Sequence, residues 1–193
     1  MFRITPVVRN LLIVNVVFYL AQQFLSVTGI LLLWPLDSEN FYPYQFITYM
    51  FAHGGLGHIF FNMFALVSFA PILENYWGDK KFLIFYLATG IGAGIIYGVV
   101  NYFTPGLDGP MLGASGAIYG ILMAFGMVFP NMEVMLLIPP IPIKAKYLVI
   151  LIGVLTYFMD SSGTVAHLAH FGGAFIAFIL ITFWRSQGQN KGW

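Results

Sequence analysis

GASGAIYGILMAFGMVF, residues 113–129, is one of six apolar stretches that decide the fold of this chain. It carries no charged residue, and apolar runs of about 20 residues cross a lipid bilayer as helices. The other five stretches are residues 8–32, 56–75, 81–102, 147–160 and 165–184. The sequence therefore predicts an all-α membrane protein, a bundle of six transmembrane helices that forms a single domain over residues 1–193.

The composition agrees with a chain that lies mostly in lipid. Hydrophobic residues make up 60% and charged residues only 8%, with a mean hydropathy of +0.86, whereas a soluble domain has about 25% charged residues. The net charge is +1 and no run of like charge is present, which argues against nucleic acid as a partner. Because the chain has no cysteine, we expect no disulfide, thiol nucleophile or cysteine-bound metal.

The positions of the basic residues predict the orientation. All eight fall in segments on one side of the predicted spans if both termini are cytoplasmic, as expected for loops that stay inside. They are Arg3, Arg9, Lys80, Lys81, Lys144, Lys146, Arg185 and Lys191.

The apolar run after Arg9 continues to about Leu33 without a small-residue cleavage pattern, so we expect a retained first span rather than a signal peptide.

The first outer segment, residues 33–55, is too long for a tight turn and rich in aromatic residues. These are Trp34, Phe41, Tyr42, Tyr44, Phe46, Tyr49 and Phe51. Such rings favour the headgroup level of a bilayer, so we expect this segment to be partly embedded in the outer interface. An aromatic belt with no further role is the alternative interpretation.

Polar side chains on three predicted spans fall at a similar shallow depth. His58 and Asn62 are four residues apart and share one helix face, while Ser115 lies near the outer end of the fourth span. His170 lies about five residues, roughly 8 Å of helix, below the outer end of the sixth span. Polar groups within spans are costly and commonly functional, so this layer is the candidate site.

This set of residues has the parts of a serine hydrolase. A hydroxyl such as that of Ser115 becomes a nucleophile when an imidazole, here neutral His170, removes its proton. The Ser115 backbone N–H with the His58 and Asn62 side chains would bind the oxyanion. No acid lies in the fourth or sixth span, so a Ser–His dyad is expected, with Tyr119 stacked on the imidazole in place of an orienting carboxylate.

Each feature also has a structural interpretation. Gly113, Gly116 and Gly120 form, with Ser115, a stripe of small residues that allows membrane helices to pack closely. A single intramembrane histidine is often only a hydrogen-bond donor. The motif is also not the GxSxG elbow of soluble hydrolases, since residue 117 is alanine and no strand is predicted before it.

Three motifs together resemble those of the rhomboid intramembrane proteases. His53-Gly-Gly-Leu-Gly-His58-Ile-Phe-Phe-Asn62 resembles their HxxxxHxxxN signature, Gly113-Ala-Ser115-Gly116 their GxSG motif, and Ala169-His170-Phe-Gly-Gly173 their AHxxG motif. The motifs occur in the expected order on the second, fourth and sixth spans, and the likeness extends from Tyr44 over nearly the whole remaining chain. The family often has a glycine at position 177, which is alanine here.

The resemblance implies a function and the role of each residue. Ser115 would be the nucleophile, His170 the base, His58 and Asn62 the oxyanion donors, and Tyr119 the stacking residue. Gly113, Gly116 and Gly173 would support them. The implied enzyme is a minimal six-span prokaryotic serine endopeptidase of a bacterial inner membrane, with no cofactor, that cleaves transmembrane segments of single-span proteins near the outer face. Residues Tyr157 to Thr164, with the fifth span, would move aside for the substrate.

Two other functions stay open from the sequence. His167 and His170 are three residues apart and, with His53 and His58, offer imidazoles for a metal site, although the HExxH carboxylate of zinc hydrolases is absent. A non-catalytic binder or channel that holds a partner helix is the other possibility.

Overall fold

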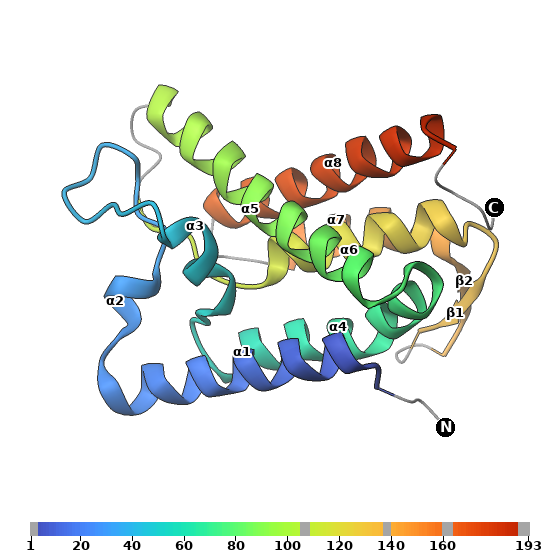
Figure 1. Ribbon diagram of the computed structural model, residues 1–193, viewed down its shortest axis with the longest axis horizontal. Helices are drawn as coiled ribbons and strands as arrows, with labels where there is room; N and C mark the ends of the chain where they lie inside the picture. The colour runs from blue at the N-terminus through green and yellow to red at the C-terminus, as the bar shows by residue number, and fades with distance from the viewer. Residues whose placement is uncertain (1–3, 105–108, 137–139, 160–163, 189–193) are drawn as a thin grey trace.

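The chain forms a helical bundle in the computed structural model, which describes residues 4–104, 109–136, 140–159 and 164–188 (Figure 1). The long helices are α1 (Pro6–Leu25), α4 (Leu56–Trp77), α5 (Asp79–Phe103), α6 (Ser115–Val128), α7 (Ala145–Met159) and α8 (Thr164–Ser186). The shorter elements are α2 (Thr28–Leu31), α3 (Gln45–Thr48), the 3-10 helix η1 (Tyr49–Phe51), β1 (Glu133–Met135) and β2 (Pro142–Lys144). The prediction of a mostly helical membrane protein is therefore confirmed.

The helices differ in length and in how deeply they are buried in the bundle. Within the described parts of the chain, four helices are long and apolar enough to cross a membrane: Pro6–Leu25, Leu56–Trp77, Asp79–Phe103 and His167–Ser186. Helix α6 is shorter and central, packed against α4, α5, α7 and α8, and all but three of its 14 residues are buried. Because protein rather than lipid surrounds α6, its length need not match the bilayer.

The first helix is shorter than the expected run of residues 8–32. It ends at Leu25 because Ser26 adopts a left-handed backbone with φ 52°, a conformation that a continuing right-handed helix excludes. The chain then turns into α2. A second feature absent from the sequence prediction is the antiparallel pair β1–β2 between α6 and α7, in which Val134 pairs with Ile143.

Residues 33–55 fold into a compact unit organised by one buried glutamine. The Gln45 side chain is 1% exposed; its oxygen accepts hydrogen bonds from the Trp34 and Tyr42 backbone N–H groups, at 3.3 and 3.2 Å, and its nitrogen donates to the Asn40 carbonyl at 2.9 Å. Buried polar groups are costly unless paired. These bonds therefore hold the path of the chain from Trp34 into α3.

The described basic residues gather at one end of the bundle. Figure 1 shows the start of α1, the β1–β2 hairpin and the end of α8 at this end, with α2 and α3 at the other. The described cations belong to these segments, to the turn between α4 and α5 or to the start of α7: Arg9, Lys80, Lys81, Lys144, Lys146 and Arg185. We refer to this end as the basic end.

Helix α1 is attached to α4 at the basic end by a buried carboxylate. Glu74 is 1% exposed and accepts hydrogen bonds from the Thr5 hydroxyl at 2.5 Å and from the Val7 and Val8 N–H groups at 2.9 Å. The first N–H groups of a helix have no partner within the helix and carry partial positive charge. Glu74 therefore caps α1 from a neighbouring helix.

Replacing Glu74 with glutamine should lower the free energy of unfolding by about 1–3 kcal/mol. The amide retains one acceptor oxygen but loses the negative charge that faces the helix terminus. Unfolding in neutral detergent measures the change, and the exposed Glu39→Gln is the matched control, expected to stay within about 0.5 kcal/mol of wild type. Equal effects in both variants would show that the cap contributes nothing.

Candidate active site

The turn before α6 is held by residues 33–55. Gly113 has φ 116°, a region that side chains other than glycine rarely adopt, and its N–H donates to the Tyr49 carbonyl at 2.9 Å. Tyr49 is fully buried and its hydroxyl donates to the Gly90 carbonyl of α5 at 2.6 Å. Residues 33–55 therefore position the start of α6. This role is additional to the one expected for them at the membrane interface.

Gly113 lies between His58 of α4 and Ser115 of α6. A Cβ placed on Gly113 would lie 2.8 Å from both Cε1 and Nε2 of His58 and 3.7 Å from the Ser115 hydroxyl oxygen. A side chain at residue 113 would thus collide with the imidazole. The structure brings these three predicted site residues together around one small space.

The contact of His58 with Gly54 favours one ring nitrogen as the proton carrier. The Gly54 N–H donates to His58 Nδ1 at 3.4 Å, so Nδ1 acts as the acceptor. In a neutral imidazole the other nitrogen is then the donor. The Nε2–H group therefore lies on the Gly113 side of the ring, where it can donate to an oxygen beside Ser115.

Asn62 lies one turn after His58 and is 6% exposed. Its side-chain nitrogen donates to the His58 carbonyl at 3.0 Å, which ties the amide to the helix backbone. An amide nitrogen carries two hydrogens, so this bond uses one of them.

His170 is held by a ring from α6. The Tyr119 and His170 rings stack with centroids 4.2 Å apart and an interplanar angle of 10°. The Tyr119 hydroxyl also contacts the Ile152 carbonyl of α7 at 3.4 Å. Tyr119 follows Ser115 by four residues, so both occupy one face of α6, and the stack places the imidazole on that face.

Close helix contact brings α8 to α6. A Cβ on Gly173 would lie only 1.8 Å from the Gly116 carbonyl oxygen, so the two backbones touch at a point where only glycine fits. Gly120 makes the corresponding contact with α5, where an added Cβ would lie 2.8 Å from the Thr89 side chain. The small-residue stripe is therefore a packing surface as well as part of the site.

His53 packs against His58 and is almost fully buried. It is 2% exposed, and its ring packs edge-on against His58 with centroids 5.1 Å apart. The Gln22 side chain of α1 binds its backbone on both sides, accepting from the His53 N–H at 2.9 Å and donating to its carbonyl at 3.4 Å. Gln22 was not anticipated from the sequence, although it is a polar residue inside the first apolar run.

Burial, with a smaller effect of the nearby His58, lowers the pKa of His53 to about 4. The unfolded chain would bind a proton at this imidazole near pH 6.5 while the folded chain would not. The contribution of His53 to stability is therefore complete above pH 6.5 and decreases as the pH falls toward 4, by about 3 kcal/mol at pH 4.

Thermal unfolding of wild type and His53→Gln between pH 4 and 7 tests this pH dependence. The neutral glutamine should remove much of the decrease in melting temperature below pH 6.5. His167→Gln, a change on α8, should keep the wild-type slope. A wild-type slope in His53→Gln would contradict the assignment.

Other predicted features are not assembled or lie outside the described residues. Among residues 4–104, 109–136, 140–159 and 164–188, no three His, Cys, Asp or Glu side chains come together as a metal site would need. The donor arrangement thus offers no support for the alternative based on His53, His58, His167 and His170. The segment expected to move for the substrate, Tyr157 to Thr164, has its centre, residues 160–163, outside the described residues.

These features define a polytopic helical membrane protein. A serine, two histidines and an asparagine lie near the starts of three of its helices, α4, α6 and α8. A family model described as the Rhomboid domain matches residues 40–187. The chain therefore belongs to the rhomboid family, as the three motifs had indicated.

Relatives carry names of the same kind. The chain is 29% identical to "Rhomboid-like protein 11, chloroplastic" of Arabidopsis thaliana, over 89% of this chain and 62% of that protein. It is 38% identical to "Putative rhomboid protease YdcA" of Bacillus subtilis, over 46% of this chain and 43% of that protein. It is 28% identical to "Rhomboid protein 1, mitochondrial" of Saccharomyces cerevisiae, over 74% of this chain and 33% of that protein. The chain thus spans less than two thirds of the length of each.

Proposed function

We propose that this protein is an intramembrane serine endopeptidase that uses Ser115 as nucleophile and His170 as general base. The observation that carries the proposal is that His58 and Ser115 both lie close to Gly113. Ser115 is on α6, and the Tyr119 ring of the same helix stacks on His170. Membership of the rhomboid family supports it.

The expected reaction follows from these roles. His170 takes the proton of the Ser115 hydroxyl as its oxygen attacks the peptide carbonyl, and the carbonyl electrons move onto oxygen. The His58 Nε2–H and the backbone N–H of Ser115 donate to that oxyanion, with Asn62 as a further donor. His170 then protonates the leaving amine, and water, activated by the same imidazole, releases the acyl group from Ser115.

The Tyr119 stack takes the place of an orienting carboxylate. In serine proteases with a triad, an acid holds the histidine in position, and no acid lies in α6 or α8. A parallel ring at 4.2 Å limits the tilt of the His170 imidazole. Tyr119 is therefore a positioning residue in this proposal.

The membrane arrangement belongs to the same proposal. We place the basic end in the cytoplasm, because loops rich in Lys and Arg remain inside, which puts Ser115 near the outer face. The substrates would be single-span proteins whose helix unwinds there, since an intact helix shields its peptide carbonyls. A minimal prokaryotic enzyme of the bacterial inner membrane fits this chain; the named relatives come from chloroplasts, mitochondria and bacteria.

A fluorophosphonate probe tests the proposal directly. It should label the wild-type protein in detergent and fail to label Ser115→Ala, because only an activated serine attacks the phosphorus. Ser68→Ala, which removes a hydroxyl that donates to the Phe64 carbonyl, is the matched control and should be labelled fully. Absence of labelling in folded wild type would favour a non-catalytic binder.

A further inference from the structure

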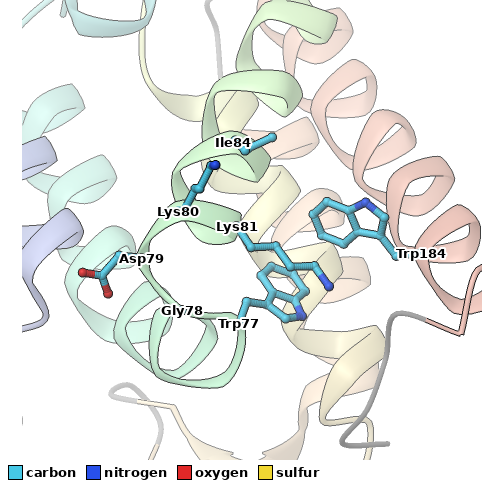
Figure 2. Close-up of a pocket in the computed structure, with 7 residues that line it drawn as sticks. All are labelled: Trp77, Gly78, Asp79, Lys80, Lys81, Ile84 and Trp184. Carbon is cyan, nitrogen blue, oxygen red and sulfur yellow. The ribbon is translucent and has the colours of Figure 1, made fainter.

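The basic end of the bundle holds a surface pocket, whereas the residues proposed for catalysis lie near the starts of α4, α6 and α8. It has a volume of about 500 Å³ and lies where the end of α4, the start of α5 and the end of α8 meet (Figure 2). Its lining residues are Trp77, Gly78, Asp79, Lys80, Lys81, Ile84 and Trp184. This combination of indoles and ammonium groups calls for an explanation in terms of a ligand.

Two tryptophans form the walls. The Trp77 and Trp184 rings meet edge to face with centroids 5.5 Å apart, and both pack on Phe85, at 5.0 and 6.0 Å. Indoles favour the headgroup level of a bilayer because one part of the ring is apolar and the N–H is polar. The walls of the pocket therefore lie where headgroups would be expected.

Lys81 is already oriented by one of these rings. Its ammonium nitrogen lies 4.4 Å from the centroid of the Trp184 ring, a cation–π contact, and Figure 2 shows the Lys81 side chain extending toward the two indoles. A lysine that is held in this way loses less side-chain entropy when it binds an anion. Lys80 beside it is exposed and adds a second positive charge.

The remaining polar groups are compatible with an anion. Asp79 is the one acid among the residues that line the pocket, and its carboxylate points away from both indoles in Figure 2. Asp79 lies in the first turn of α5, where the helix terminus favours negative charge. The Trp77 indole N–H is buried and has no acceptor among the described residues.

We propose that this pocket binds the phosphate of an anionic phospholipid headgroup. Basic pockets between membrane helices on the cytoplasmic side are suited to such headgroups. Ile84, one turn after Lys80 on α5, is 52% exposed and presents an apolar surface beside the ammonium groups. A lipid satisfies both features, with its phosphate at the lysines and its acyl chain along α5, whereas free phosphate satisfies only the first.

Bound lipid would connect segments that are distant in sequence. The pocket joins the turn between α4 and α5 to Trp184 at the end of α8. The proposal does not depend on proteolysis, so its test measures binding rather than cleavage.

Native mass spectrometry of the wild-type protein in neutral detergent tests the proposal. Dioleoyl phosphatidylglycerol should be retained at one site more tightly than dioleoyl phosphatidylcholine. Lys80→Gln/Lys81→Gln should weaken this site about 25-fold, because each lysine near an anionic headgroup contributes about fivefold. Lys144→Gln/Lys146→Gln, which removes the same charge from the end of β2 and the start of α7, should stay within about twofold of wild type.

Three outcomes would overturn the proposal. Equal weakening in both double variants would show that the lipid responds only to overall charge, and equal retention of the two lipids would show no headgroup preference. Displacement of the lipid by millimolar glycerol phosphate would show a site for free phosphate. If Lys80→Gln/Lys81→Gln does not fold, Lys80→Gln alone, a change at an exposed residue, should still weaken binding about fivefold.

Discussion

Cleavage of a single-span substrate in lipid vesicles should fall by about 10⁴-fold or more in Ser115→Ala and in His170→Ala. The Ser115→Ala/His170→Ala double variant should be no slower than either single variant, because a nucleophile and its base act as one unit. Initial rates at several substrate concentrations measure the change. The loss should appear in kcat, since neither residue is expected to hold the ground-state substrate.

The alternatives give different results in the same assay. A metal-dependent hydrolase would retain its activity in Ser115→Ala and lose it with a chelator. Residual activity of more than about 1% in His170→Ala, with normal melting temperature, would mean that another group accepts the serine proton. His167→Ala serves as the control, because it removes an imidazole from the same helix and should stay within a few fold of wild type.

Replacing Gly173 with alanine should produce the largest combined loss of stability and activity. The added Cβ would lie 1.8 Å from the Gly116 carbonyl oxygen, and because that atom belongs to the backbone, α6 and α8 must separate. Overpacking of this kind costs about 1–3 kcal/mol. A displacement of about 1 Å between Ser115 and His170 would also reduce cleavage about 100-fold.

Gly153→Ala on α7 is the matched control, because nothing lies within 4 Å of a Cβ added there. Its melting temperature should equal or exceed that of wild type, since alanine favours helix more than glycine does by up to about 1 kcal/mol. Melting temperature, fluorophosphonate labelling and cleavage should all fall in Gly173→Ala. Normal labelling in that variant would mean that α6 and α8 tolerate separation at the site.

The two variants test different parts of the proposal. Ser115→Ala removes the reacting atom and leaves the packing intact, whereas Gly173→Ala leaves every reacting atom in place and changes the distance between helices. Loss of activity in both would support a site that needs its chemical groups and their positions. Loss in Gly173→Ala alone would leave a bundle whose function does not use Ser115.

The six apolar runs and three polar motifs could be read from the sequence because they depend on local chemistry. Lipid excludes charge and unpaired backbone, so the helical class followed from composition and spacing. Ser115, Tyr119 and the four-residue interval between them were also local, since one helix face determines their common direction.

The tertiary structure decided everything that depends on chain segments meeting. The end of α1 at Leu25, the β1–β2 pair and the Gln45 hydrogen bonds join residues that are close in sequence, but no residue type there signals them clearly. The Glu74 cap carries no local signal, because Glu74 and its partners at the start of α1 lie 66 to 69 residues apart. The same holds for the pocket between Trp77 and Trp184.

For this protein, then, the sequence alone predicted a helical membrane bundle, a common side for its basic residues, and the candidate residues of a serine hydrolase. Only the tertiary structure decided that His58 faces Gly113 through its Cε1–Nε2 edge and that the Tyr119 ring stacks on His170. The physical reason is that spacing along a helix determines the direction of a side chain, whereas distance between helices depends on backbone contacts such as that of Gly173 with Gly116.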